Sequence, residues 1–216
     1  LAGCVAAERD PDRVTELFAL FDETDPAYRK TGLAGFAANA ADFVRRPVEL
    51  GARPALLDEA GTEKIAGMLT WPGKPLPPGY EPPRPLTADE QAQFDMGKIL
   101  YAGVCAGCHQ PNGAGLNGIA PPLIDSEWVT GSPDRLSRIV LHGVRGYITV
   151  KGRRYQLDMP PLGALGDEPI AAVLTYLRRE WGHGADPISP DFVKKVREKE
   201  AGRTDSWTEK ELLKIE

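Results

Sequence analysis

Proline is concentrated in one segment near the middle of this chain, where it limits which elements can form. Seven of the sixteen residues in the segment 71–86 are proline. Because proline lacks a backbone N–H and has a fixed φ angle, this segment cannot form a helix interior or a central strand. We predict a stiff, extended linker at 71–86, with a separate folding unit on each side of it.

Residues 1–70 are predicted to be helical throughout. Asp10-Pro11 and Asp25-Pro26 each place a capping carboxylate directly before a proline, which is the usual start of a helix. Apolar residues follow the first of these starts at helical spacing and are Val14, Leu17, Phe18 and Phe21.

A short internal repeat runs through the same region. The tripeptide Leu-Ala-Gly at 1–3 recurs at 33–35, an offset of 32 residues. Such a period is typical of paired helices in a solenoid, and an irregular helical cap is the alternative. The chain before Cys4 also fits a lipoprotein cleavage box, but we favour a small buried cysteine on a helix at this position.

Residues 87–184 are predicted to form the second domain. Its first helix begins at a capping box made by Thr87 and Glu90, and we expect it to end near Gly103. Another helix is predicted to begin at Ser132-Pro133.

The later part of this domain combines a hairpin, a helix and a tail. Residues 147–158 are predicted to form a short β-hairpin that turns at Lys151-Gly152. The last helix of the domain begins at Asp167, and the tail 185–216 is expected to form short helices that pack on the outside. The predicted fold class is all-α, with one small hairpin.

The motif Cys105-Ala-Gly-Cys108-His109 predicts covalent attachment of haem. Two cysteines at this spacing can each form a thioether to one edge of a porphyrin, and the next residue, His109, then lies beneath the iron as a ligand. A zinc site would need two further ligands at suitable spacing. The remaining cysteine, Cys4, is about a hundred residues upstream.

Met159 is the candidate for the sixth iron ligand. It precedes Pro160-Pro161, so its loop is expected to be stiff and its thioether fixed in place. His142 is the main rival, although a histidine at the end of a helix commonly interacts with the last carbonyls. His183 lies between two glycines and is expected to be an exposed loop residue.

A histidine–methionine pair favours electron transfer over catalysis at the iron. The thioether raises the reduction potential relative to two histidines, and two protein ligands leave no open axial position. A haem enzyme or gas sensor in which Met159 dissociates is the alternative, and a third hypothesis makes the helical region 1–70 a scaffold that binds a partner.

The net charge of −5 and the lack of a basic stripe argue against a nucleic-acid partner. The sequence has no apolar run of about eighteen residues or more, so no membrane span is expected.

The two propionates of a haem need cationic or hydrogen-bonding partners, and arginine matches carboxylates well. Strand alternation would turn only one residue of the pair Arg153 and Arg154 inward. The candidates for these contacts are Trp128, Arg145, Arg153, Arg154 and Tyr155.

Residues 87–184 resemble class I c-type cytochrome domains. Gly97 and Tyr101 on the first helix, the cysteine motif, the Pro-Pro-Leu of 121–123, Met159-Pro160 and the final helix follow one another in the order of that family. The resemblance implies one covalent haem c and a close crossing of the first and last helices at Gly97. It also implies a proline carbonyl that accepts the second ring proton of His109, from Pro121 or its neighbour Pro122, beside Leu123.

A narrower resemblance involves the segments 126–132, 138–143 and 201–207. They are similar to cytochrome domains at the C-terminus of bacterial dehydrogenase-like proteins, behind a HEAT-type helical region. This resemblance implies a dehydrogenase as electron donor and another cytochrome or an oxidase as acceptor. Covalent haem attachment, which in the cytochrome family takes place outside the bacterial cytoplasm, implies a periplasmic or otherwise extracytoplasmic location. The narrower resemblance also implies a longer natural protein, with any enzyme activity in a part upstream of this chain.

Overall fold

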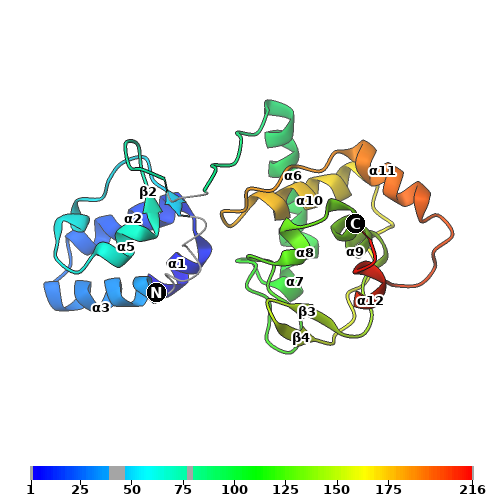
Figure 1. The fold of residues 1–216 in the computed structure, drawn as a ribbon, viewed down its shortest axis with the longest axis horizontal. Helices are drawn as coiled ribbons and strands as arrows, with labels where there is room; N and C mark the ends of the chain where they lie inside the picture. Colours follow the sequence, from blue (N-terminus) through cyan, green and yellow to red (C-terminus); the bar gives the residue numbers. More distant parts are fainter. Residues whose placement is uncertain (1, 39–46, 77–79, 216) are drawn as a thin grey trace. The chain divides into compact units, whose positions relative to one another are not determined.

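The computed structural model describes residues 2–38, 47–76 and 80–215 of the chain. The chain divides into two compact units, Leu1–Pro82 and Pro83–Glu216, which Figure 1 shows as ribbons. The division falls inside the proline-rich segment. Leu1, with which the short repeat begins, lies outside the described residues, and so does the side chain of Cys4.

The first unit contains short helices and one pair of strands. Asp10 and Asp25 cap the second and third helices as expected, because each side chain accepts backbone N–H bonds from the first turn. Phe18 and Phe21 of the second helix are buried, and a phenylalanine of the third helix packs on Phe18. The elements are α1 (Ala2–Glu8), α2 (Pro11–Asp22), α3 (Pro26–Ala37), β1 (Val48–Glu49), η1 (Ala55–Asp58), α5 (Glu63–Gly67) and β2 (Leu69–Thr70).

The expectation that residues 1–70 are helical throughout was wrong. β1 pairs with β2 in parallel, with Val48 opposite Leu69. The N–H of Val48 donates to the carbonyl of Met68 over 2.9 Å. Parallel pairing joins residues that are distant in sequence, so no local pattern signals it. Ala2 and Gly3 of the repeated tripeptide lie on α1, and their counterparts Ala34 and Gly35 lie on α3; the two helices pack against each other.

The second unit contains the remaining helices and a hairpin. Thr87 and Glu90 form the predicted capping box at the start of α6. Strands β3 and β4 form the predicted antiparallel hairpin, and Lys151 and Gly152 turn with φ angles of 50° and 74°. The elements are α6 (Ala88–Val104), α7 (Ala106–His109), α8 (Glu127–Thr130), α9 (Pro133–His142), β3 (Ile148–Val150), β4 (Arg153–Tyr155), α10 (Asp167–Arg179), α11 (Pro190–Lys199) and α12 (Glu209–Leu212).

Helices α6 and α10 pack against each other (Figure 1), and Gly97 lies at their contact. A Cβ atom at Gly97 would lie 2.0 Å from the carbonyl oxygen of Ala172 and 2.8 Å from the Cβ of Tyr176. Tyr101, Tyr176 and Trp181 pack their rings together, with centroids 5.2 to 5.7 Å apart. The missing side chain therefore permits the close crossing that the sequence predicted.

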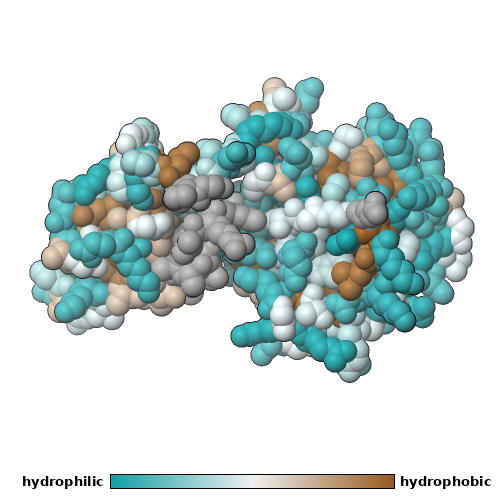
Figure 2. Space-filling model, viewed as in Figure 1, coloured by the Kyte–Doolittle hydropathy of each residue, from teal (hydrophilic) through white to brown (hydrophobic). Residues whose placement is uncertain are grey.

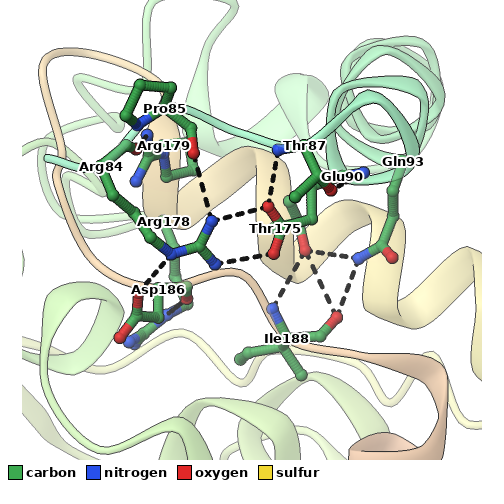
Figure 3. Close-up of polar contacts among 10 residues, drawn as sticks. All are labelled: Arg84, Pro85, Thr87, Glu90, Gln93, Thr175, Arg178, Arg179, Asp186 and Ile188. Carbon is green, nitrogen blue, oxygen red and sulfur yellow. Dashed lines mark hydrogen bonds and ion pairs between the residues drawn. The ribbon is translucent and has the colours of Figure 1, made fainter.

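The chain just before α6 is bound to the second unit (Figure 3). Both terminal nitrogens of Arg84 donate to the carboxylate of Glu90 over 2.7 Å. Arg179 donates to the carbonyl of Arg84 over 2.6 Å. The side chain of Gln93 donates to the carbonyl of Ile188 over 2.8 Å, and this bond joins α6 to the start of the tail.

The tail is part of the core of the second unit. Val193 and Val196 of α11 are buried in the same cluster as Leu174 of α10. Hydrophilic residues predominate on the face of each unit seen in Figure 2, with apolar residues visible in smaller areas. Within the described ranges, no helix combines the length and apolar character that crossing a bilayer requires.

Candidate functional site

The cysteine motif forms a single tight turn at the end of α6. The N–H groups of Cys108 and His109 donate to the carbonyl of Cys105 over 3.2 and 3.0 Å. Gln110 ends the turn with a φ angle of 64°, which few residues other than glycine adopt. The hydroxyl of Tyr101 donates to the carbonyl of Gln110 over 2.5 Å. The aromatic cluster between α6 and α10 therefore holds the end of the motif.

The imidazole of His109 is buried and oriented by the loop that follows it. Its Nδ1 lies 2.9 Å from the carbonyl oxygen of Pro121, which leaves Nε2 as the nitrogen that can bind a metal. Gly115 lets this loop close, because a Cβ there would lie 2.6 Å from the carbonyl carbon and oxygen of Pro121. Of the two prolines that the sequence left open, Pro121 and not Pro122 makes this contact.

Burial lowers the pKa of His109, and the hydrogen bond to Pro121 acts in the opposite direction. Burial therefore favours the neutral ring, which is the state that a metal ligand needs. Burial is also the main cause that raises the pKa of the Cys105 thiol to about 11, with the nearby Cys108 adding to it. Cys105 is partly buried and Cys108 is exposed, and both are free of disulfides.

Met159 is held by the chain that follows α9. Its backbone exchanges two hydrogen bonds with Val144, of 2.8 and 3.1 Å. Gly143 has a φ angle of 74°, and a Cβ there would lie 2.3 Å from the carbonyl oxygen of Met159. The Met159 segment therefore fits against a stretch of backbone that only glycine permits.

An apolar cavity extends from the motif to Met159. Its empty volume is about 1080 Å³, part of which is open to solvent. Apolar side chains from α9, α10 and β3 form much of its wall, among them Val140, Leu177 and Ile148. The predicted site residues that line it are Cys105, Cys108, His109, Pro121, Leu123, Trp128 and Met159.

The predicted contacts from the hairpin are not part of this cavity wall. Arg153 and Arg154 are exposed, and the guanidinium of Arg154 lies 4.3 Å from the centre of the Tyr147 ring. Tyr155 is buried in a cluster with Trp128. Val150, the strand partner of Arg153, does line the cavity. Arg153 itself lies at the turn end of the hairpin, and its side chain is exposed to solvent.

Two other expectations about polar groups need correction. The indole N–H of Trp128 donates to the carbonyl of Thr149 over 2.8 Å, so it is engaged within the protein. His183 is buried, with 2% of its surface exposed, and not an exposed loop residue. Its Nδ1 lies 2.6 Å from the carbonyl of Leu177, and its Nε2 accepts the N–H of Asp125.

The sequence did not reveal several residues of the site. Gly143 directly follows α9, and its contact with Met159 is apparent only in the fold. Val144, Ile148 and Val150 also line the cavity. Ile148 and Val150 were predicted only as part of a hairpin, and Val144 lay in no predicted element. Their place at the site depends on how the hairpin packs on α9, which has no local signal.

These groups together fit one kind of cofactor. Two thiols beside a neutral imidazole, an apolar cavity, and a thioether on its wall suit a planar group that carries a metal and is attached to the chain. The fold and the site thus define a haem protein.

The comparisons with known proteins identify the family. Residues 92–177 match the family described as cytochrome C oxidase, cbb3-type, subunit III. Cytochrome c-552 of Thermus thermophilus is 42% identical over 117 residues, which cover 50% of this chain and 78% of that protein. The chain belongs to the c-type cytochromes, whose cofactor is haem c and whose chemistry is haem-based electron transfer.

Two further relatives are parts of dehydrogenases. The fructose dehydrogenase cytochrome subunit of Gluconobacter japonicus is 34% identical over 110 residues, which cover 47% of this chain and 22% of that protein. The gluconate 2-dehydrogenase cytochrome c subunit of Pantoea cypripedii is 32% identical over 91 residues, which cover 41% and 21%. The chain thus spans about a fifth of each of these two subunits.

Proposed function

We propose that this chain carries one haem c, bound covalently through Cys105 and Cys108, and that it transfers single electrons. His109 and Met159 are the proposed axial ligands. One observation carries the proposal: His109 and Met159 line the same apolar cavity, while the other ring nitrogen of His109 contacts the Pro121 carbonyl. When bound, the haem supplies an iron that alternates between the ferrous and ferric states.

The residues around the cavity have separate roles in this proposal. The carbonyl of Pro121 accepts the Nδ1 proton of His109, fixes the ring and makes Nε2 a stronger ligand. The thioether of Met159 favours the reduced state. Leu123 and Trp128 help to exclude water from the cavity, and an apolar surrounding also influences the potential.

The partners are proposed from the relatives. Two of them are cytochrome subunits of dehydrogenases, which supports a dehydrogenase as electron donor and a cytochrome or an oxidase as acceptor. Contact with such partners would use a small, transient interface, which is typical of electron-transfer complexes. Cytochrome c relatives of this kind also support an extracytoplasmic location, which we propose to be the periplasm.

A separate proposal concerns the kind of region that the first unit forms. Helices α1 and α3 carry the described residues of the repeat, Ala2-Gly3 and Ala34-Gly35, and pack on each other. This packing supports a HEAT-like helical region that joined this domain to a dehydrogenase-like part of a longer protein. Residues 71–86 would be the linker between that region and the cytochrome domain 87–184, with 185–216 as the tail of that domain.

Spectroscopy on the haem-loaded protein tests this function. Ferric haem with a methionine ligand has a weak long-wavelength absorption band, and we expect to observe it. We also expect reduced protein to bind carbon monoxide poorly at neutral pH, because both axial positions are filled. Ready binding of carbon monoxide would instead favour a haem enzyme or gas sensor in which Met159 dissociates.

A further inference from the structure

The backbone of Val144 lies between two other segments of the chain. On one side it exchanges two hydrogen bonds with Met159. On the other side it pairs in parallel with Trp207 of the tail. The N–H of Trp207 donates to the carbonyl of Gly143 over 3.0 Å, and the N–H of Arg145 donates to the carbonyl of Trp207 over 2.8 Å. The segment that presents Met159 is therefore the outer member of a three-segment ladder, with the tail at its other edge.

This ladder leaves little room for independent movement. Because a Cβ at Gly143 would lie 2.3 Å from the carbonyl oxygen of Met159 and 3.0 Å from the carbonyl carbon of Pro160, the two segments are in direct backbone contact. A shift of Gly143 and Val144 would therefore displace Met159. Trp207 limits such a shift from the opposite side.

The side chain of Trp207 is itself held in place. Only 8% of its surface is exposed, and it belongs to the same buried cluster as Val144. The guanidinium of Arg203 lies 3.5 Å from the centre of the Trp207 ring, within the range of a cation–π contact. Arg203 also forms an ion pair of 3.1 Å with Glu211, which caps α12 together with Thr208.

We propose that Trp207 is a positioning residue for the sulfur ligand: it holds Gly143 and Val144 so that Met159 remains at the cavity. The proposal rests on the proposed axial role of Met159. Trp207 lies outside residues 92–177, which match the family, so this support is an addition to the matched domain. The Met159 thioether and external ligands would compete for the same position on the iron. If the Met159 segment were less firmly held, external ligands would occupy that position more often.

The test compares variants of the haem-loaded full chain. Trp207→Ala removes the ring, and Trp207→Phe keeps a ring that can pack in the same place. Val193→Ala is the control, because it also shortens a buried tail side chain, but one that belongs to the core cluster of α9, α10 and α11 and not to the cluster that contains Trp207 and Val144. For each variant we would measure the long-wavelength ferric band, the affinity of ferric iron for imidazole, and the midpoint of thermal unfolding.

We expect Trp207→Ala to weaken the ferric band. A tenfold rise in the population without methionine on the iron would tighten imidazole binding by about tenfold, and this is the change that we expect. Trp207→Phe should restore most of the original affinity, and Val193→Ala should lower the thermal midpoint without changing imidazole affinity. Arg203→Ala provides a milder variant should Trp207→Ala fail to retain haem, and it should shift imidazole binding in the same direction.

Two results would overturn the proposal. The first concerns only the role of Trp207, and the second also concerns Met159 as a ligand. If the Trp207 and Arg203 variants bind imidazole as the original chain does, the tail has no positioning role, while Met159 remains the ligand. If the original chain lacks the ferric band and Met159→Ala leaves its spectrum unchanged, the ligand assignment fails as well.

Discussion

The absence of a side chain at Gly97 decides how closely α6 and α10 approach. A Cβ there would lie 2.0 Å from the carbonyl oxygen of Ala172, so Gly97→Ala must push the two helices apart. Overpacking of this kind typically costs about 1–3 kcal/mol of unfolding free energy, and we expect the upper part of that range. Chemical denaturation of the haem-loaded protein measures it.

Gly103 is the matched control on the same helix, because a Cβ there meets nothing within 4 Å. Glycine is less favourable than alanine inside a helix by roughly 0.5–1 kcal/mol, so Gly103→Ala should leave stability unchanged or raise it. Equal effects of the two substitutions would show that the crossing does not depend on Gly97.

Met159 is the residue on which the proposed potential depends. Met159→Ala should leave the haem attached, since Cys105 and Cys108 are intact. It should lower the reduction potential, within the roughly 0.8 V range that axial ligands span, and let reduced protein bind carbon monoxide. A spectrum and a potential that stay the same would mean that another residue is the sixth ligand.

The stability of the capping box at the start of α6 should depend on pH in the acid range. The hydrogen bonds from Arg84, followed by that from the Thr87 backbone, lower the pKa of Glu90 from 4.5 to about 2. The ionised form of Glu90 therefore stabilises the folded state above pH 4.5, and this stabilisation is lost as the pH falls toward 2.

Glu90→Gln should consequently remove part of the acid sensitivity of the second unit. The measurement is the unfolding free energy of the original chain and of Glu90→Gln between pH 5 and pH 2. The difference in unfolding free energy between these two proteins should shrink as the pH falls. Thr87→Ala, which removes the other half of the capping box, should cost about 1 kcal/mol at all of these pH values. If Glu90→Gln leaves the pH profile unaltered, the cap has no such role.

Local signals predicted the elements better than their pairing. Asp10, Asp25, Thr87 and the turn at Lys151-Gly152 each have a chemical reason to begin or turn an element, and the structure confirms them. The pairing of β1 with β2 and that of Val144 with Trp207 joins residues that are far apart in sequence. Pairings of only one or two residues leave no periodic pattern, so the sequence could not predict them.

The same contrast applies to the site. The spacing of Cys105, Cys108 and His109 is local chemistry, and the turn of α7 places them together. The place of Met159 on the cavity wall depends on contacts with Gly143 and Val144 that only the fold reveals. Contacts to the propionates were predicted from residue type and strand alternation, and these do not fix where a side chain points in the folded protein.

At the scale of the whole molecule, the two units should be separable. Residues 83–216 form one compact unit with their own core, so this fragment should fold, attach haem and give the spectrum of the full chain. A shorter fragment, 87–216, should be less stable, because it lacks Arg84 and its bonds to Glu90 and Arg179. Thermal unfolding followed at the haem band compares the two, and equal midpoints would contradict this role of Arg84.

A redox titration of the purified full chain, followed by its absorption spectrum, tests the central claim most directly. Iron between the imidazole of His109 and the sulfur of Met159 should give a single reversible one-electron transition, with low-spin spectra at both ends. A protein that remains colourless after expression with haem maturation, or one whose spectrum does not respond to potential, would contradict the account.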